Sequence, residues 1–115
     1  MAPDPDCIFC KIAAGKIPAG VVKRDADFLA FRDVNPQAPT HILIIPIEHV
    51  KSLDDARDQA LLGRLLGFAR DVARAEGIAQ RGYRVVVNTN ADGGQTVFHL
   101  HLHVLGGRPM TWPPG

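Results

Sequence analysis

The chain has 115 residues, of which 46% are hydrophobic and 22% are charged, and this composition fits one small domain that buries roughly two-thirds of its unfolded surface. The net charge of +1 lacks the positive excess that nucleic-acid-binding proteins usually carry. No apolar run approaches the roughly 18 residues of a membrane span, and residues 1–6 do not look like a secretory signal. We therefore expect a single domain over residues 1–115 in the cytoplasm, with neither nucleic acid nor a membrane as partner; small anionic ligands remain compatible.

Apolar periodicity, prolines and glycines predict five strands and two helices. The expected strands cover residues 21–24, 27–31, 41–45, 83–87 and 97–105. A short helix is expected at residues 7–14, ended by Gly15. A long amphipathic helix is expected after Ser52 to Asp55, which have the spacing of a capping box, and Gly77 or Gly82 ends it.

This order of elements predicts an α+β domain with the long helix packed on one sheet face. The first two strands should pair as a hairpin, and the strand at residues 41–45 should be central in the sheet. Residues 1–6 are expected to be a disordered lead, and the proline-rich residues 106–115 an irregular tail.

Two glycines, Gly63 and Gly67, lie inside the expected long helix, where each costs roughly 1 kcal/mol relative to alanine. Such a cost indicates close backbone packing, for example against a partner subunit. Tolerated surface glycines are the alternative interpretation.

Residues 98–104 (FHLHLHV) alternate histidine with apolar residues at a period of two. On a strand, His99, His101 and His103 would share one face, and the apolar residues, Phe98 included, would point into the core. The outer histidines would be roughly 13 Å apart at Cα, which strains a shared metal site. A phosphate presents several oxygens and suits a row of imidazoles better. We therefore predict phosphoryl or nucleotidyl chemistry with His101 as the nucleophile.

The loop before these histidines, residues 90–96 (NADGGQT), supplies polar donors and two glycines. The glycines allow backbone N–H groups to approach an anion closely. A Gly-Gly pair alone is equally typical of a simple turn, so only its position directly before the histidines favours a phosphate-binding loop.

Cys7 and Cys10 have the Cys-x2-Cys spacing of half a zinc site, although no second half follows at the usual short spacing. In a reducing compartment a close pair is more often a metal or redox element than a structural disulfide. Reduced thiols without a metal are the alternative.

Residues 99–105 (HLHLHVL) match the motif of the histidine triad (HIT) superfamily, and the chain resembles its Hint branch. The resemblance also covers residues 31–41 (FRDVNPQAPTH), 92–97 (DGGQTV) and 106–115 (GGRPMTWPPG). The ending WPPG favours Hint proteins over dinucleoside polyphosphate hydrolases. The resemblance implies an antiparallel sheet of about five strands with one long and one short N-terminal helix. It also implies that this sheet continues across a homodimer.

The function implied by the resemblance is hydrolysis of the P–N bond of purine nucleoside 5′-phosphoramidates through a nucleotidyl-histidine intermediate. His101 would attack the phosphorus, His99, His103 and His41 would orient or stabilise the phosphate, and Thr96 would donate to the departing amine. Asp33 would bind the ribose hydroxyls. The base would lie among Ile8, Phe9, Ile17, Phe31, Val34 and Leu43. The phosphate and leaving group would lie near Asn88, Gly94, Gln95, Thr96 and Val97, and Trp112 would reach the partner's site. Purine nucleoside monophosphates are the implied ligands.

Many bacterial proteins that the chain resembles hold a structural zinc with such a cysteine pair and two histidines, which here are His49 and His99. The resemblance implies no cofactor for the chemistry itself, and a His99 bound to zinc would affect catalysis only indirectly. Two alternative functions stay open at this point. They are a dinucleoside polyphosphate hydrolase and a non-catalytic nucleotide-binding or interaction module.

Overall fold

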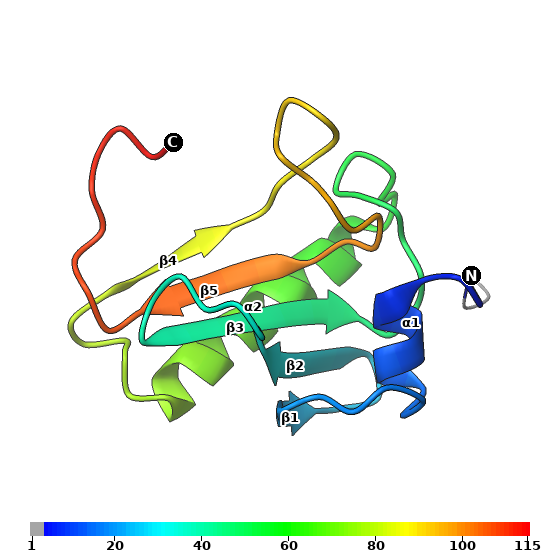
Figure 1. Ribbon diagram of the computed structural model, residues 1–115, viewed down its shortest axis with the longest axis horizontal. Coiled ribbons are helices and arrows are strands. Elements are labelled where there is room, and N and C mark those ends of the chain that lie inside the picture. Colours follow the sequence, from blue (N-terminus) through cyan, green and yellow to red (C-terminus); the bar gives the residue numbers. More distant parts are fainter. Residues whose placement is uncertain (1–3) are drawn as a thin grey trace.

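The computed structural model describes residues 4–115, which form one antiparallel sheet with a helix against each face (Figure 1). The strands are β1 (Val21–Arg24), β2 (Phe28–Arg32), β3 (Thr40–Pro46), β4 (Tyr83–Val86) and β5 (Leu102–Gly106), and the helices are α1 (Ile8–Ala13) and α2 (Gln59–Ala75). The strand order is β1-β2-β3-β5-β4. The α+β class, the hairpin of β1 and β2 and the central position of β3 are thus confirmed.

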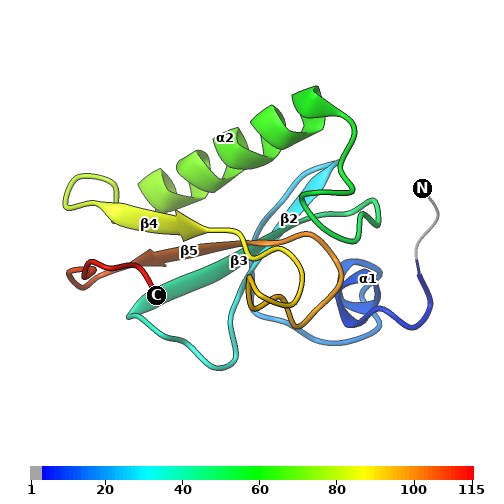
Figure 2. The same ribbon diagram turned by 90° about the horizontal axis from the view of Figure 1, so that it is seen from above.

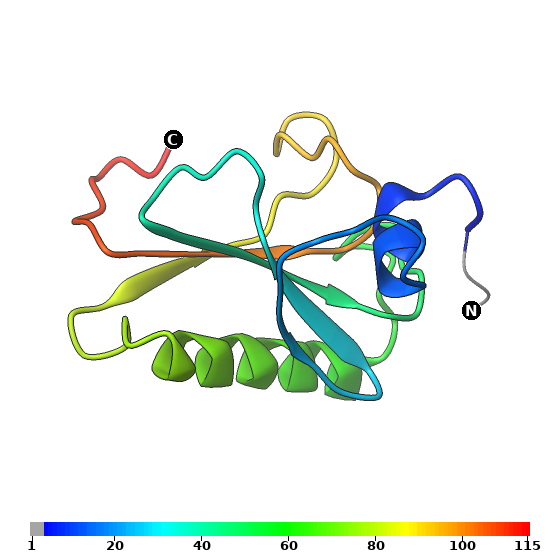
Figure 3. The same ribbon diagram turned by 60° about the horizontal axis from the view of Figure 1, so that its bottom comes forward.

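The alternation of side chains along β2 and β3 divides the core into two parts. Ala30 and Ile44 face α2 and pack with its buried residues, such as Leu65. Leu29 and Leu43 point to the other face and pack with α1. Figure 3 shows α2 below the sheet and α1 above it. The histidines of β3 and β5 lie on the face opposite α2, because His103 is paired with Leu43 across the strands.

Helix α1 forms where the sequence predicts it. Its N-cap is Cys7, whose sulfur accepts from the backbone N–H of Cys10, and Gly15 follows the helix with a positive φ of 75°. Of the expected disordered lead, residues 1–3 lie outside the described residues. Residues 4–6 form a turn, in which the N–H of Cys7 donates to the carbonyl of Asp4 at 3.1 Å, so the expectation of disorder is wrong there.

Helix α2 begins later than predicted. Its N-cap is Asp58, whose carboxylate accepts from the backbone N–H groups of Ala60 and Leu61. The expected capping box is a separate turn, closed by a 2.7 Å hydrogen bond from Ser52 Oγ to Asp55 Oδ2. That prediction is wrong because the Ser-x-x-Asp spacing serves an isolated turn as well as a helix start. Gly77, with φ of 76°, ends the helix as expected.

Strand β5 is shorter than the predicted strand at residues 97–105. It begins at Leu102, and residues 97–99 form a bend. Phe98 is half exposed instead of buried, while the N–H of Leu100 donates to the carbonyl of Val50 at 2.7 Å. The strand does not extend back to residue 97, because the side chain of His99 lies in a separate buried cluster with two cysteines and His49. The prediction that all three histidines share one strand face is therefore wrong.

The glycines of α2 face outward in the single chain. A Cβ atom at Gly63 would meet nothing within 4 Å, and one at Gly67 would meet only the end of the Arg70 side chain at 3.9 Å. Figure 2 shows α2 over one face of the sheet, beside the edge strand β4. Close packing within the chain therefore does not explain these glycines. Among residues 4–115, no helix has both the length and the apolarity that a membrane crossing requires.

Candidate active site

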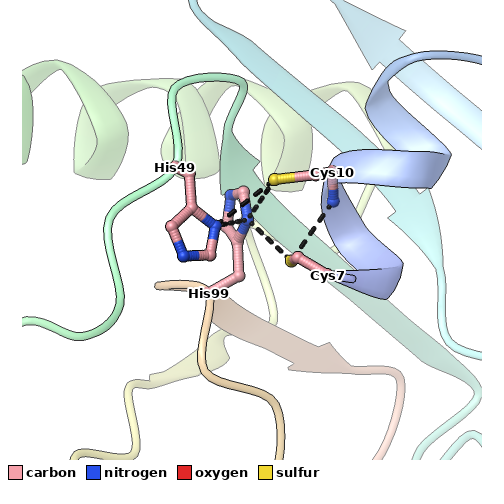
Figure 4. A group of neighbouring side chains, drawn as sticks. All are labelled: Cys7, Cys10, His49 and His99. Carbon is pink, nitrogen blue, oxygen red and sulfur yellow. Dashed lines mark hydrogen bonds between the residues drawn. The ribbon is translucent and has the colours of Figure 1, made fainter. Parts of the chain in front are cut away.

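The five histidines separate into two groups. His41, His101 and His103 lie together beside Asp33, and we call this group the histidine cluster. His49 and His99 lie with two cysteines, Cys7 and Cys10, and we call that group the Cys/His cluster (Figure 4). His101 and His103 belong to one centre and His99 to the other, although the three residues alternate along the chain.

His101 has a defined tautomer. Its Nδ1 atom is 2.7 Å from the carbonyl oxygen of His99, and because a carbonyl only accepts, Nδ1 carries the ring proton. In the neutral ring Nε2 then holds the free lone pair. Burial lowers the pKa of His101 below 6.5, against the opposing effects of the His99 carbonyl and Asp33. A neutral nucleophilic ring is therefore available at pH 7.

His103 and His41 are in hydrogen-bond contact. His41 Nε2 is 2.9 Å from His103 Nδ1, and the ring of His103 is centred 5.0 Å from that of His101. Burial, and then repulsion from His101 and His41, lowers the pKa of His103 to about 4. Burial also lowers the pKa of His41, although the nearby Asp33 carboxylate opposes it. The cluster is thus uncharged at its imidazoles near neutral pH.

An apolar wall adjoins the histidine cluster. The ring of Phe9 meets that of His101 edge-on at 5.1 Å and that of Phe31 at 5.5 Å. Leu43 is buried in the same cluster of side chains. The other residues expected around the base are more open: Ile17 is partly buried, Ile8 is 47% exposed and Val34 is 99% exposed. The structure therefore brings Phe9 beside His101 and leaves Val34 in solvent.

The loop at residues 90–96 is held by Gln95, which is buried. Its amide oxygen accepts from the N–H of Asn90, and its amide nitrogen donates to the carbonyls of Lys51 and Val97. Gly93 is required by the loop itself, because an added Cβ would lie 2.4 Å from the carbonyl oxygen of Thr89. In the structure Gln95 and Gly93 thus shape the loop that precedes the histidines.

The remaining residues of the expected site are partly buried or exposed. Thr96 and Gly94 are exposed, and Asn88 and Val97 are partly buried. Asp33 is also partly buried, and its Oδ1 atom accepts from the N–H of Asn35 at 2.8 Å. Trp112 is 80% exposed and lies against Arg84 of β4, with the guanidinium carbon 5.9 Å from its ring centre.

The Cys/His cluster joins α1, the segment after β3 and the segment before β5. His99 Nδ1 is 3.3 Å from Cys7 Sγ, His49 Nδ1 is 3.3 Å from Cys10 Sγ, and the two Nδ1 atoms are 3.2 Å apart. All four side chains are buried, and neither cysteine is in a disulfide. Burial lowers the pKa of His99 to about 4 and raises that of Cys10.

These positions fit a tetrahedral metal ion. Zinc bonds of about 2.3 Å to sulfur and about 2.0 Å to nitrogen separate the ligand atoms by roughly 3.3 to 3.8 Å. His99 Nε2 is 2.7 Å from the carbonyl of Pro46, so it carries the proton and leaves Nδ1 free to bind a metal. Two cysteine thiolates and two neutral imidazoles are ligands that zinc prefers.

A second group of possible ligands, Asp33, His41 and His103, is less suited to a metal. The N–H of Gln37 donates to His41 Nδ1 at 3.0 Å, so the proton of the neutral ring is on Nε2. That nitrogen has no lone pair for an ion. Residue types could not predict this contact, or the contact of His99 with the Pro46 carbonyl, because both are made by backbone groups that every residue carries.

Comparison with known proteins agrees with this geometry. The family profile of the HIT domain matches residues 14–110. The chain belongs to the HIT family. It is 54% identical to an uncharacterized HIT-like protein of Synechocystis, over 96% of this chain and 97% of the relative. It is 49% identical to the purine nucleoside phosphoramidase of Escherichia coli, over 91% of this chain and 90% of the relative.

The solved structures include a HIT family hydrolase from Legionella pneumophila, which superposes with a TM-score of 0.93. It is 56% identical, and the match covers 96% of this chain and all of that one. The predicted HIT fold and the predicted enzyme class are both confirmed: the chain is a HIT family hydrolase.

Proposed function

We propose that this HIT protein hydrolyses the P–N bond of purine nucleoside 5′-phosphoramidates through a nucleotidyl-histidine intermediate. The observation that carries the proposal is the hydrogen bond from His101 Nδ1 to the His99 carbonyl, which leaves Nε2 as a neutral nucleophile. The identity to the Escherichia coli enzyme, whose name is purine nucleoside phosphoramidase, supports the choice of substrate class.

The reaction takes place in two steps. His101 Nε2 attacks the α-phosphorus, the P–N bond breaks, and the amine departs with a proton that solvent supplies through the Thr96 hydroxyl. Water then attacks the phosphorus and gives up a proton to solvent, the bond between phosphorus and Nε2 breaks, and the nucleoside monophosphate is released. Fixed N–H donors that meet the phosphate oxygens stabilise the charge that develops there. We assign that role to His103 of β5, whose ring centre is 5.0 Å from that of His101.

The other site residues have proposed roles that follow their positions. Phe9 and Phe31 form the apolar wall for the base, and Asp33, at the end of β2, accepts from the ribose hydroxyls. Thr96 donates to the departing amine. In this proposal Trp112 acts on the leaving group of the partner's site, since it lies exposed on the tail.

The experiment is a turnover assay with an adenosine 5′-phosphoramidate that carries a fluorescent amine. We expect release of the amine by the native protein and a decrease in kcat of at least roughly 1,000-fold in His101→Ala, because the nucleophile is lost. Circular dichroism and thermal unfolding of His101→Ala control for folding defects, and Asp54→Ala, an exposed position outside both clusters, should retain the native kcat. Binding of AMP without turnover that depends on His101 would instead support a binding module.

We also propose that the Cys/His cluster holds a structural zinc ion through Cys7, Cys10, His49 and His99. The support is the convergence of four buried ligand atoms and the tautomer of His99. The ion would have four protein ligands and no open position, so it would supply stability and no chemistry. It would fix the backbone at residue 99, whose carbonyl orients His101.

A second copy of the chain is the proposed partner, bound through α2 and β4. The edge strand β1 has an irregular register and carries Lys23 and Arg24, features that oppose pairing. The other edge, β4, pairs regularly and adjoins a shallow hollow lined by Gly63, Leu66 and Gly67 of α2. Glycines at this surface allow close approach of a partner helix. Two β4 strands would then continue the sheet across the dimer.

A further inference from the structure

The ring of His41 has different partners at its two nitrogens. At Nδ1, it accepts a hydrogen bond from the backbone N–H of Gln37 at 3.0 Å. A backbone N–H only donates, so in the neutral ring Nδ1 is the unprotonated nitrogen and Nε2 carries the proton. The backbone N–H of Gln37 therefore determines the tautomer of His41.

The proton on His41 Nε2 in turn decides the tautomer of His103. The two atoms His41 Nε2 and His103 Nδ1 are 2.9 Å apart, which is a hydrogen bond with one proton between them. Because that proton belongs to His41, His103 Nδ1 accepts. The proton of the His103 ring must then be on Nε2.

We propose that His41 is a positioning residue that, through its Gln37 contact, fixes His103 as an Nε2–H donor. Asp33 supports this arrangement, since its Oδ2 atom is 3.4 Å from the same His41 Nε2 and favours a proton there. With both rings neutral, as their lowered pKa values indicate, the assignment holds at pH 7.

The C-terminal tail contacts the main chain at Gln37, at the carbonyl of the peptide that follows the one whose N–H contacts His41. Arg108 Nε donates to the carbonyl of Gln37 at 3.1 Å. Gly107 lies so close to Pro39 that an added Cβ would be 2.9 Å from the proline ring. The tail thus supports the loop whose N–H orients His41, and the hydrogen bonds of Arg108 within residues 4–115 go to backbone carbonyls.

The consequence for catalysis rests on the proposed function. The neighbouring rings of His101 and His103 carry their protons on opposite nitrogens: His101 on Nδ1, His103 on Nε2. The first ring therefore presents a lone pair to the phosphorus. The second presents an N–H to a phosphate oxygen.

The first test is nitrogen-15 NMR of the full-length protein with labelled histidine at pH 7. We expect His103 with a protonated Nε2 and an unprotonated Nδ1, and a coupling between its Nδ1 and His41 Nε2 across the hydrogen bond. A proton on His103 Nδ1, or on His41 Nδ1, would overturn the proposal. The measurement needs no substrate, so it stands apart from the proposed function.

The second test compares His41→Gln with His41→Leu. The glutamine amide reaches a similar distance and keeps an N–H donor, whereas leucine fills the space without one. We expect kcat within about fivefold of the native value in the glutamine variant and a roughly 100-fold lower kcat with little change in KM in the leucine variant. The NMR spectrum should show a single His103 tautomer only in the glutamine variant.

Equal losses of kcat in the two variants would overturn the positioning role, because the imidazole of His41 itself would then be needed. Native protein that shows the expected tautomers but no turnover would overturn the proposed function and leave the tautomer assignment intact. Arg108→Leu should broaden the His41 signals if the tail braces the loop. An unchanged spectrum in Arg108→Leu would show that the tail does not hold the loop that orients His41.

Discussion

At the scale of single residues, burial controls the chemistry of the histidine cluster. His101 is 6% exposed and sits between the rings of Phe9 and His103. An imidazolium there would lose its hydration, so the neutral form is favoured and the pKa falls. The ring of the proposed nucleophile is thereby kept neutral, with a free lone pair on Nε2, over a wider range of pH.

This residue-scale effect predicts how activity depends on pH. Because the pKa of His101 is lowered, its lone pair persists below pH 6.5 and is lost only at lower pH. We expect kcat/KM for the phosphoramidate to stay constant from pH 8 down to 6.5 and to fall on further acidification. A profile of kcat/KM between pH 4 and 8 measures this.

The control is circular dichroism at each pH, which separates loss of activity from loss of structure. An acid limb with a midpoint above 6.5 would contradict the prediction, since it would mean that the ring is more basic than an exposed histidine.

At the scale of elements, the start of α2 depends on one carboxylate. Asp58 accepts from the N–H groups of Ala60 and Leu61, at 3.0 and 3.2 Å. We expect Asp58→Ala to lower the free energy of unfolding by about 1 kcal/mol, because two N–H groups lose their acceptor. Urea denaturation measures the difference.

The matched control is Asp54→Ala, an exposed position in the preceding turn. Its change should stay within about 0.5 kcal/mol, as is usual for surface substitutions. The reverse order of effects would show that the helix is capped from the turn and not from Asp58.

At the scale of the whole molecule, the Cys/His cluster ties together segments far apart in sequence. Cys7 and His99 are 92 residues apart. If zinc binds there, we expect about one ion per chain in purified protein and a decrease in Tm of roughly 10 °C on chelation, because binding energy adds to folding energy. Metal analysis and thermal unfolding measure the two quantities.

The variant Cys7→Ser provides the control for chelation. It should contain little metal, and its Tm should not fall further with chelator. Native protein without metal, whose Tm is insensitive to chelator, would show that the cluster is a set of reduced thiols and imidazoles.

The proposed dimer also belongs to this scale. Leu66 on α2 is 55% exposed and Val21 on β1 is 56% exposed. Val21 is therefore a control with the same exposure that lies outside the proposed interface. We expect Leu66→Lys to convert the dimer to a monomer, because a charge would be buried in the interface, while Val21→Lys stays dimeric. Light scattering with size-exclusion chromatography measures the mass, and a native monomer would end the proposal.

Sequence periodicity was sufficient for much of the fold. The sequences of β2 and β3 contain nearly continuous apolar runs, residues 28–31 and 42–46, and such runs indicate buried strands before the tertiary structure is known. The start of α2 could not be predicted in the same way, since Ser52 and Asp58 both offer an acceptor, and only the packing of Leu61 and Leu65 decides which begins the helix.

By itself, the sequence determined the residue types of the site: three alternating histidines, a cysteine pair and a glycine loop. Only the tertiary structure decided how the histidines divide, because a bend at residues 97–99 sends His99 to the cysteines and leaves His101 and His103 with His41. It also decided which nitrogen of each ring carries the proton. Those protons are fixed by backbone groups of residues 37, 46 and 99, whose positions depend on the folded chain and leave no mark in residue type.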